Sequence, residues 1–168
     1  MRRERERSAK QSQASAYTLV EMVTVLMIMS IIGLTASYVI IESAKVYART
    51  VPAMDASYKA NLAAERMKRE IRDLKSTSSI TTLGATAFTF DDSSDNTIAY
   101  SLSGTDLLRN GDLLAKGTTD LSFSYWKDDG TTASSASDLH FVEVALTVQT
   151  GNEPYAVQMA AFPRALSP

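Results

Sequence analysis

A single carboxylate stands at the start of an apolar run long enough to cross a membrane. Glu21 lies within SAYTLVEMVTVLMIMSIIGL, residues 15–34, and the next charged residue after it is Glu42. An unpaired carboxylate on a membrane helix costs on the order of a few kcal/mol at depth, and less near the interface. Headgroup water at the interface is one compensation. The other is a cation, because a cut between Ala16 and Tyr17 would create an α-amino group one helical turn from Glu21, and the amine of a neighbouring copy could pair with the acid.

Elsewhere the residue types argue against an active site. His140 is the only histidine and lies in an expected strand, and the chain has no cysteine, so it has no thiolate nucleophile, disulfide or zinc–thiolate site. It has neither a nucleophile-elbow pattern nor a phosphate-binding glycine loop. Asp91, Asp92 and Asp95 could approach a calcium ion, but they lack the spacing and the distal glutamate of an EF-hand loop, which favours a solvated turn. We therefore predict no enzyme activity, no cofactor and no metal site.

The composition is that of a folded protein without an affinity for nucleic acid. The 168 residues are 45% hydrophobic and 21% charged, and the formal net charge is -2. Such a chain can form one modest domain with an appendage. No basic stripe interleaved with aromatic residues follows the first ten residues, so no nucleic-acid partner is predicted.

Residues 1–16 are expected to be a leader peptide that is removed. They hold several arginines, contain no apolar run and end in the small residue Ala16. In an ordinary secretory signal peptide the small-residue cleavage site follows the apolar core, whereas here it precedes the core. Cleavage between Ala16 and Tyr17 would therefore keep the apolar run as the N-terminal segment of the mature protein.

Residues 17–41 are expected to form a membrane-spanning helix. Between Met22 and Ile41 there is no charge and no proline, and about twenty apolar residues cross a bilayer core as a helix. The polar residues in this run are all small, which lets helices approach closely. The basic leader predicts a cytoplasmic N-terminus and an exported C-terminal remainder. A plain single-pass anchor is the alternative interpretation of the run.

The helix is expected to continue to residue 75 with a kink or short break near Thr50 and Val51, because Pro52 lacks a backbone donor and crowds the preceding turn. Beyond Pro52, one apolar face has the helical period and is expected to lie under a folded head. Its members are Ala53, Ala56, Ala60, Ala63 or Ala64, Met67, Ile71 and Leu74.

A second row on this helix lies roughly opposite the first and holds Val51, Met54, Tyr58 and Leu62. It either meets other subunits or adds to the intramolecular core, and the exposure of Tyr58 and Leu62 distinguishes the two interpretations. On the exposed side, the pairs Glu65 with Arg69 and Arg66 with Glu70 are expected to add a few tenths of a kcal/mol each.

Residues 76–168 are expected to form a β-sheet head. After a Ser/Thr-rich hinge at residues 76–82, apolar residues alternate with polar ones, which indicates strands at 86–90, 97–102, 121–126, 140–148 and 155–162. Asn110-Gly111 predicts a hairpin, because both central positions of a type I′ turn need positive φ. The expected fold class is therefore α+β, with a long N-terminal helix packed on a C-terminal antiparallel β-sheet.

The segment AYTLVEMVTVLMIMSIIGLTA resembles the class III signal and N-terminal helix of type IV pilins and type II secretion pseudopilins. In that family a glycine is followed by Phe-Thr-Leu-Ile/Val-Glu and an apolar run, so Ala16 and Tyr17 stand where glycine and phenylalanine are usual. The resemblance implies cleavage after Ala16 by a prepilin peptidase, N-methylation of Tyr17 and a helix-packing acid at Glu21. It also implies a single-pass protein of the bacterial inner membrane with an extracytoplasmic head, which later enters a filament with other pilin or pseudopilin subunits.

Later segments add to this resemblance. ERMKREIRDL, YSLSGTDLLRNGDLLAKGTTDLSFSYW and FPRAL look like the J-type minor pseudopilins and related minor pilins. The absence of the cysteine pair found in many major pilins favours a minor component. The expected function is that of a minor pilin or pseudopilin, a structural subunit of a type IV pilus or type II secretion pseudopilus. A membrane-anchored extracytoplasmic binding module is the alternative, and an anchored enzyme would need a site that the sequence does not offer.

Overall fold

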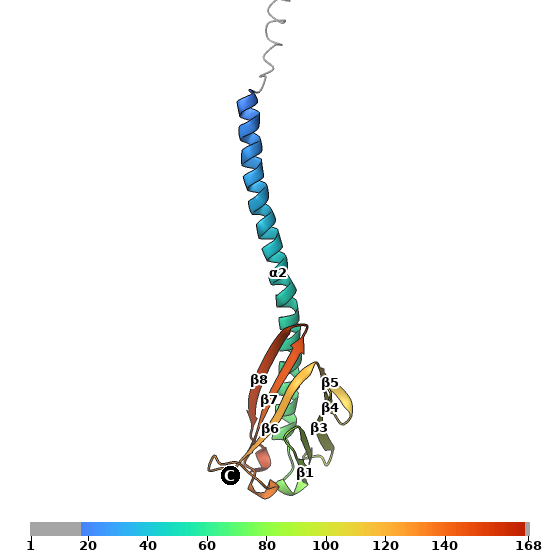
Figure 1. Cartoon of the computed structure of the whole chain (residues 1–168). Coiled ribbons are helices and arrows are strands. Elements are labelled where there is room, and N and C mark those ends of the chain that lie inside the picture. The colour runs from blue at the N-terminus through green and yellow to red at the C-terminus, as the bar shows by residue number, and fades with distance from the viewer. Residues whose placement is uncertain (1–17, 167–168) are drawn as a thin grey trace, which may run out of the picture. The chain divides into compact units, whose positions relative to one another are not determined.

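The computed structural model describes residues 18–166, in which one long helix, α2 (Leu19–Arg72), precedes eight strands (Figure 1). The expected α+β class is confirmed. Two compact units are present, one ending at Val46 and the other beginning at Tyr47. The strands are β1 (Ile80–Leu83), β2 (Ala87–Asp91), β3 (Thr97–Ser103), β4 (Asp106–Arg109), β5 (Asp112–Lys116), β6 (Thr118–Trp126), β7 (Phe141–Thr150) and β8 (Glu153–Ala161), with short 3-10 helices η1 (Thr77–Ser79), η2 (Ala136–Asp138) and η3 (Arg164–Leu166).

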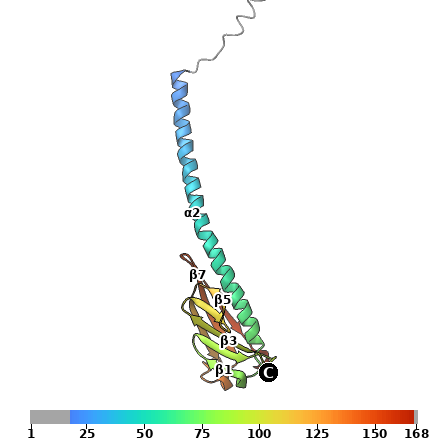
Figure 2. The same cartoon turned by 90° about the vertical axis from the view of Figure 1, so that its right-hand side faces the viewer.

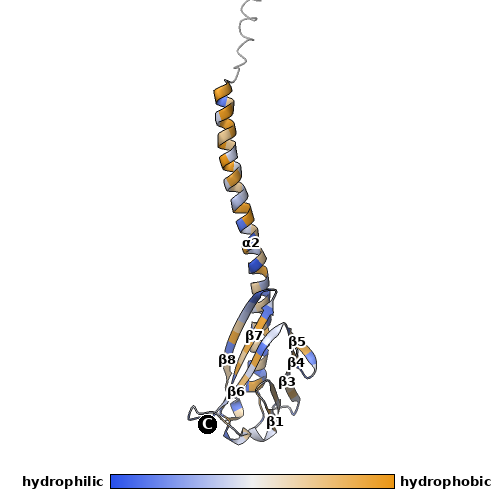
Figure 3. Cartoon of the chain, viewed as in Figure 1, coloured by the Kyte–Doolittle hydropathy of each residue, from blue (hydrophilic) through white to orange (hydrophobic). Residues whose placement is uncertain are grey.

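The first unit contains the apolar part of α2, and its described side chains are all exposed. Figure 3 shows the hydrophobic colour that dominates this stretch. It lies in the one helix of residues 18–166 that is long and apolar enough to cross a membrane. At 1.5 Å per residue, the segment from Leu19 to Ile41 is about 34 Å long, which matches a hydrocarbon core of about 30 Å.

The small polar residues of this apolar stretch bond to their own helix. The hydroxyls of Thr24, Ser30 and Ser37 donate to the backbone carbonyls four residues earlier, at oxygen–oxygen distances of 2.8, 2.7 and 2.8 Å. Because each hydroxyl proton is already bonded, these residues can face lipid or another helix without an unsatisfied donor.

Of the kink or short break expected near Thr50 and Val51, the break is absent, because α2 is continuous through Pro52. A proline removes only the bond of its own missing N–H, and the residues on both sides keep the helical conformation. The helix ends at Arg72, three residues before the expected end, and Leu74 then forms an isolated bridge with Asp92.

In the second unit, the expected face of α2 is buried. Ala56, Ala60, Ala63, Ala64, Met67, Ile71 and Leu74 are all at most 5% exposed, whereas Ala53 is half-buried. Figures 1 and 2 show this part of the helix running alongside the strands. The buried residues change from alanine to bulky side chains toward the end of the helix. The backbone can therefore approach the strands closely at first, while Met67 and Ile71 fill space further along.

The strands form two antiparallel sheets, although the sequence predicts one. Strands β1 to β5 form a meander in sequence order, and β6, β7 and β8 form a second sheet. Gly117 separates them, because its φ of +83° turns the chain out of β5, and a Cβ atom there would lie 2.4 Å from the Gln149 carbonyl oxygen. Only glycine tolerates both this conformation and this approach.

The five expected strands are present with shifted ends, and one further strand is not expected. Strand β1 (Ile80–Leu83) falls at the end of the Ser/Thr-rich segment taken as a hinge, where it pairs antiparallel with β2. The Asn110-Gly111 hairpin is confirmed, with φ of 51° and 86° at the two residues. The Asn110 side chain also ties this hairpin to β3, because its Oδ1 accepts the Ala99 N–H at 2.7 Å and its Nδ2 donates to the Thr97 carbonyl at 3.0 Å.

One core connects the helix to both sheets. Met67 and Ile71 belong to the same cluster as Phe88 of β2 and Val144 of β7. The ring of Phe88 lies 5.7 Å from that of Phe123 in β6, centroid to centroid, so the aromatic residues bridge the two sheets. The second unit therefore has its own hydrophobic interior, to which the apolar stretch before Val46 does not contribute.

A fragment that begins at Ala53 should therefore fold as a soluble monomer. It retains the buried helix face and both sheets and loses the exposed apolar stretch, which is the main source of aggregation in water. The check is sedimentation or light scattering in buffer without detergent. The matched control begins at Leu19 and should need detergent, and an Ala53 fragment that aggregates would contradict the division into two units.

Candidate functional site

The residues expected to carry processing and assembly lie at the N-terminal end of α2. Ala16 and Tyr17, the expected cleavage and methylation positions, fall outside the described residues. Thr18 and Glu21 are described, and both are exposed. Glu21 occupies the first turn of the helix.

Thr18 caps the helix and sets the position of Glu21. The Thr18 hydroxyl oxygen accepts the Glu21 backbone N–H at 3.2 Å, and the Thr18 carbonyl accepts the N–H of Met22 at 3.2 Å. This is the N-cap arrangement, in which a threonine precedes an acidic residue by three positions. The sequence analysis did not predict this cap, although the Thr-x-x-Glu spacing of Thr18 and Glu21 is typical of a helix N-terminus. A carboxylate in the first turn is also favoured by the positive end of the helix dipole.

The surroundings of Glu21 are otherwise apolar. A shallow hollow on the helix surface is lined by Glu21, Met22, Val25 and Leu26. Glu21 makes no ion pair with any residue between 18 and 166. The described part of the chain therefore offers it helix-end electrostatics but no cation.

The second row on α2 faces solvent. Met54 and Tyr58 are each 68% exposed, and Leu62 is 56% exposed. The interpretation of this row as intramolecular core is therefore wrong. Contact with other subunits stays a prediction. Within the second unit the row adds an apolar strip on the side of α2 away from the core.

A charged group of the second unit, Glu70, links α2 to β3 and β4. The Arg109 Nε lies 2.9 and 2.8 Å from the two Glu70 carboxylate oxygens, and the Arg66 Nε lies 3.1 Å from one of them. The Tyr100 hydroxyl donates to the other oxygen. The expected Arg66–Glu70 pair is present, but Glu70 is not on the exposed side, since only 17% of its side chain is exposed. Glu65 and Arg69 form no ion pair in the described chain.

These contacts fix the protonation of Glu70 and Tyr100. Burial acts to raise the pKa of Glu70, but the hydrogen bonds from Arg109, Tyr100 and Arg66 together outweigh it and hold that pKa below its ordinary value. Burial and the neighbouring carboxylate raise the pKa of Tyr100, so its hydroxyl keeps its proton and can donate it. The sequence could suggest the helical spacing of Arg66 and Glu70, but not the arrival of Arg109 from 39 residues away.

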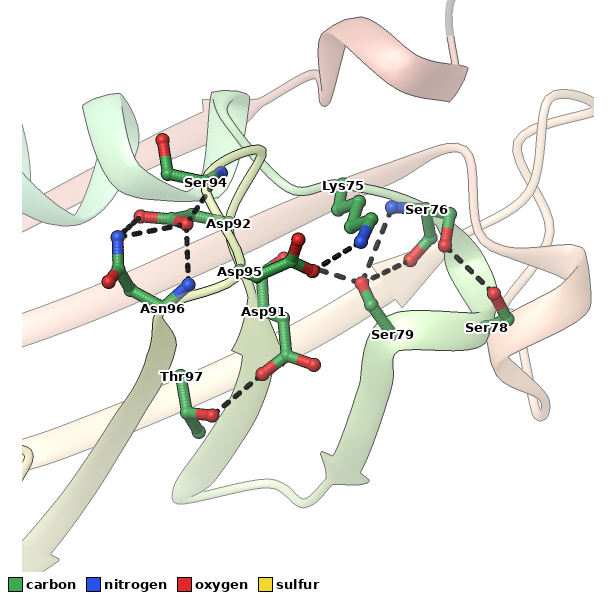
Figure 4. Close-up of polar contacts among 10 residues, drawn as sticks. All are labelled: Lys75, Ser76, Ser78, Ser79, Asp91, Asp92, Ser94, Asp95, Asn96 and Thr97. Atoms are coloured by element: carbon green, nitrogen blue, oxygen red, sulfur yellow. Dashed lines mark hydrogen bonds and ion pairs between the residues drawn. The ribbon is translucent and has the colours of Figure 1, made fainter.

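The acidic loop between β2 and β3 is an internally bonded turn (Figure 4). One oxygen of Asp92 accepts the backbone N–H groups of Ser94 and Asn96, each at 2.9 Å. Asp91 accepts the Thr97 hydroxyl at 2.8 Å, and Asp95 pairs with Lys75. Each carboxylate thus has a protein donor, and within residues 18–166 no three histidine, aspartate or glutamate side chains gather to hold a metal ion.

His140 is part of an aromatic cluster on the second sheet. Its ring lies edge-on to Phe141 and Phe162, at centroid distances of 6.4 and 6.2 Å, and its Nε2 lies 3.4 Å from an Asp128 oxygen. The ring is about a quarter exposed. Packing against two aromatic rings and a contact with the exposed Asp128 therefore explain the position of the His140 ring.

No protein-family model matches the chain, and no curated protein matches it significantly. The functional assignment therefore depends on the residues described above and on the resemblance of the N-terminal segment.

Replacing Glu70 by glutamine should destabilise the second unit at neutral pH. The variant leaves Arg109 without its carboxylate, which we expect to lower the free energy of unfolding by about 1–3 kcal/mol. The pKa of Glu70 is depressed in the folded state, so its contribution is present above the unfolded pKa and is lost as the pH falls below 4.5 through the folded pKa. The difference between the wild type and the variant should therefore shrink in acid.

The measurement is urea unfolding in uncharged detergent, followed by the fluorescence of Trp126, the only tryptophan. The matched control is Glu65→Gln, at an exposed glutamate without an ion pair in the described chain, which should change stability by less than about 0.5 kcal/mol. An equal loss for Glu70→Gln at neutral and acid pH would contradict the assigned charge interaction.

Proposed function

We propose that the chain is a minor pilin or pseudopilin, a structural subunit that is processed by a prepilin peptidase and assembled into a type IV pilus or type II secretion pseudopilus. Its partners are the peptidase, the lipid of the bacterial inner membrane and the helices of other pilin or pseudopilin subunits. One observation carries the proposal: Thr18 caps α2 at the Glu21 N–H, and the helix continues as an apolar stretch that no residue between 18 and 166 covers.

A helix that exposes apolar side chains all round must be covered by lipid or by other helices. Lipid covers it before assembly and neighbouring helices cover it afterwards. The small residues of this stretch are compatible with lipid and also favour packing against neighbouring helices. Beyond the adjoining backbone of its own helix and its chain neighbours, no described atom lies within 4 Å of the position that a Cβ of Gly33 would take, so a neighbouring helix can approach closely there.

Glu21 acts in this proposal as the group that selects the axial register. In the bilayer interface, water and headgroups satisfy the carboxylate. In the core of a filament, an unpaired acid would cost several kcal/mol, on the order expected for a buried charge that has lost its water. The amine of Tyr17 on a staggered neighbour compensates that cost in one register and not in others.

The second unit stays folded through both stages. Its helix face is buried on its own sheets, so the exposed strip of Met54, Tyr58 and Leu62, on the side of α2 away from the core, remains available to neighbouring subunits. This division lets the subunit leave the membrane without any change in the head.

Processing is the first test of the proposal. The protein purified from membranes of cells with an active prepilin peptidase should begin at Tyr17, carry an N-methyl group and lack residues 1–16. Intact-mass analysis measures both changes. A full-length chain in such cells would contradict the assignment and favour a membrane-anchored extracytoplasmic binding module.

Replacement of Glu21 by glutamine tests the role of the carboxylate. The variant keeps the size and hydrogen bonding of the side chain but removes its charge. We expect normal cleavage and membrane insertion and an incorporation into filaments that falls by about tenfold or more, as the loss of one desolvated charge pair predicts. Crosslinking to partner subunits measures incorporation.

The matched control for this test is Glu42→Gln. Glu42 lies on the same helix, is exposed and, among residues 18–166, forms an ion pair only with Lys45 at 3.1 Å, so this exposed pair contributes little. Its variant should assemble normally. Undiminished incorporation of the Glu21 variant would identify Glu21 as an interfacial acid satisfied by water.

A further inference from the structure

Four cations gather where α2 ends. Lys68, Arg69 and Arg72 of α2 and Arg164 of η3 line one open hollow of about 200 Å³, with Glu65 as its only acid. We call this site the basic hollow. With four positive charges and one negative, it carries a net charge of +3 on a chain whose total is -2.

These four cations are unpaired in the described part of the chain. None of them forms an ion pair or a side-chain hydrogen bond there. Most other described lysines and arginines have an acidic partner, as Lys59 has Asp55 and Arg109 has Glu70. Only Arg49 and Lys116 among the rest do not. Uncompensated positive charge is therefore concentrated at this place.

Helix electrostatics explain only part of the cluster. Arg69 and Arg72 lie in the last turn of α2, where the negative end of the dipole favours cations. Arg164 comes from the opposite end of the chain, and its position is set by buried neighbours. Pro163 is buried and accepts the Leu166 N–H at 3.1 Å, while the Leu166 side chain packs on the core. The fold thus holds a fourth cation beside the other three, at the cost of mutual repulsion.

The surroundings select the kind of anion that fits. A second hollow shares Arg69 and Arg164 with the first, but it is also lined by Glu70, Asp73 and Asp92. These carboxylates would repel a long polyanion such as a nucleic acid, which needs an extended basic track. A compact group of carboxylates can bind the arginines in two-pronged pairs and stay clear of the acidic border. The open shape admits side chains from another protein surface without deep burial.

We propose that the basic hollow binds the carboxylates of an acidic segment on a partner protein. The proposal concerns a surface of the head and is independent of the proposed processing and packing of the N-terminal helix. It assigns Arg69 and Arg164 as contacts, because these guanidinium groups come from α2 and η3, the two elements that line the basic hollow.

The test uses a fluorescently labelled oligoglutamate peptide and the full-length protein in uncharged detergent at low salt. The anisotropy of the label should rise with protein concentration, and the affinity should weaken as salt is added. The double variant Arg69→Gln with Arg164→Gln should lose affinity by about tenfold or more, which corresponds to two charge-assisted contacts. The pair Lys68→Gln with Arg72→Gln provides a second variant with the same expected direction.

The matched control is Arg49→Gln with Lys116→Gln, which removes the same charge from exposed positions outside the hollow that form no ion pair with any described residue. Its affinity should stay within about twofold of the wild type, because distant exposed charges are screened. Urea unfolding followed by Trp126 fluorescence should be unchanged in every variant, since these side chains are exposed or half-exposed.

Three results would overturn the proposal. The first is no binding of oligoglutamate by the folded wild type. The second is an equal loss of affinity in the control, which would indicate attraction by overall charge. The third is displacement of the peptide by inorganic phosphate at an equal concentration of anionic groups, which would make the basic hollow a site for a small oxyanion.

Discussion

The burial of one stripe of α2 against two sheets is the interaction on which the second unit depends. Neither sheet closes on itself, and the helix contributes buried apolar residues to the same core cluster as both sheets. The buried stripe has alanines at positions 56, 60 and 63 and bulky residues at Met67 and Ile71, so small side chains allow a close approach of the backbone and the larger ones fill the core further along. A stripe of uniformly large residues would hold the helix away from the strands, so the order of sizes along α2 is part of the fold.

Polar contacts fix the rotation and position of the helix on this apolar surface. Hydrophobic burial is not directional, and a helix with a smooth alanine stripe could slide or turn. Glu70 prevents this near one end by its bonds to Arg109 and Tyr100, which are directly opposite each other on β4 and β3. Asp55 acts nearer the start of the unit, where it accepts the Thr150 hydroxyl of β7 at 3.0 Å. One contact joins the helix to each sheet, so the two sheets are also positioned relative to each other.

Local patterns predicted the features that depend on neighbours in sequence. Alternation located five strands, and Asn110-Gly111 located a hairpin. The buried stripe of α2 followed from the helical period, and the Thr18 cap was within reach of the same reasoning. Features that depend on distant segments were not predictable. Strand β1 has only two apolar residues, which is too few for a clear alternation. The division into two sheets follows from the approach of Gly117 to Gln149. Arg109 and Arg164 reach α2 from far along the chain.

The capping of α2 bears on why an acid can stand at the start of an apolar helix. The Thr18 hydroxyl oxygen accepts the Glu21 N–H, which satisfies one of the free backbone donors in the first turn of α2. The dipole at the helix N-terminus still favours its negative charge by about 0.3–1 kcal/mol in an exposed setting. This gain reduces the cost of the acid at a wet interface, but it is small beside the cost of a charge that has lost its water. At a wet interface, the helix dipole and water together are therefore enough to stabilise the Glu21 carboxylate. Where water is excluded, the carboxylate needs a cation as a partner.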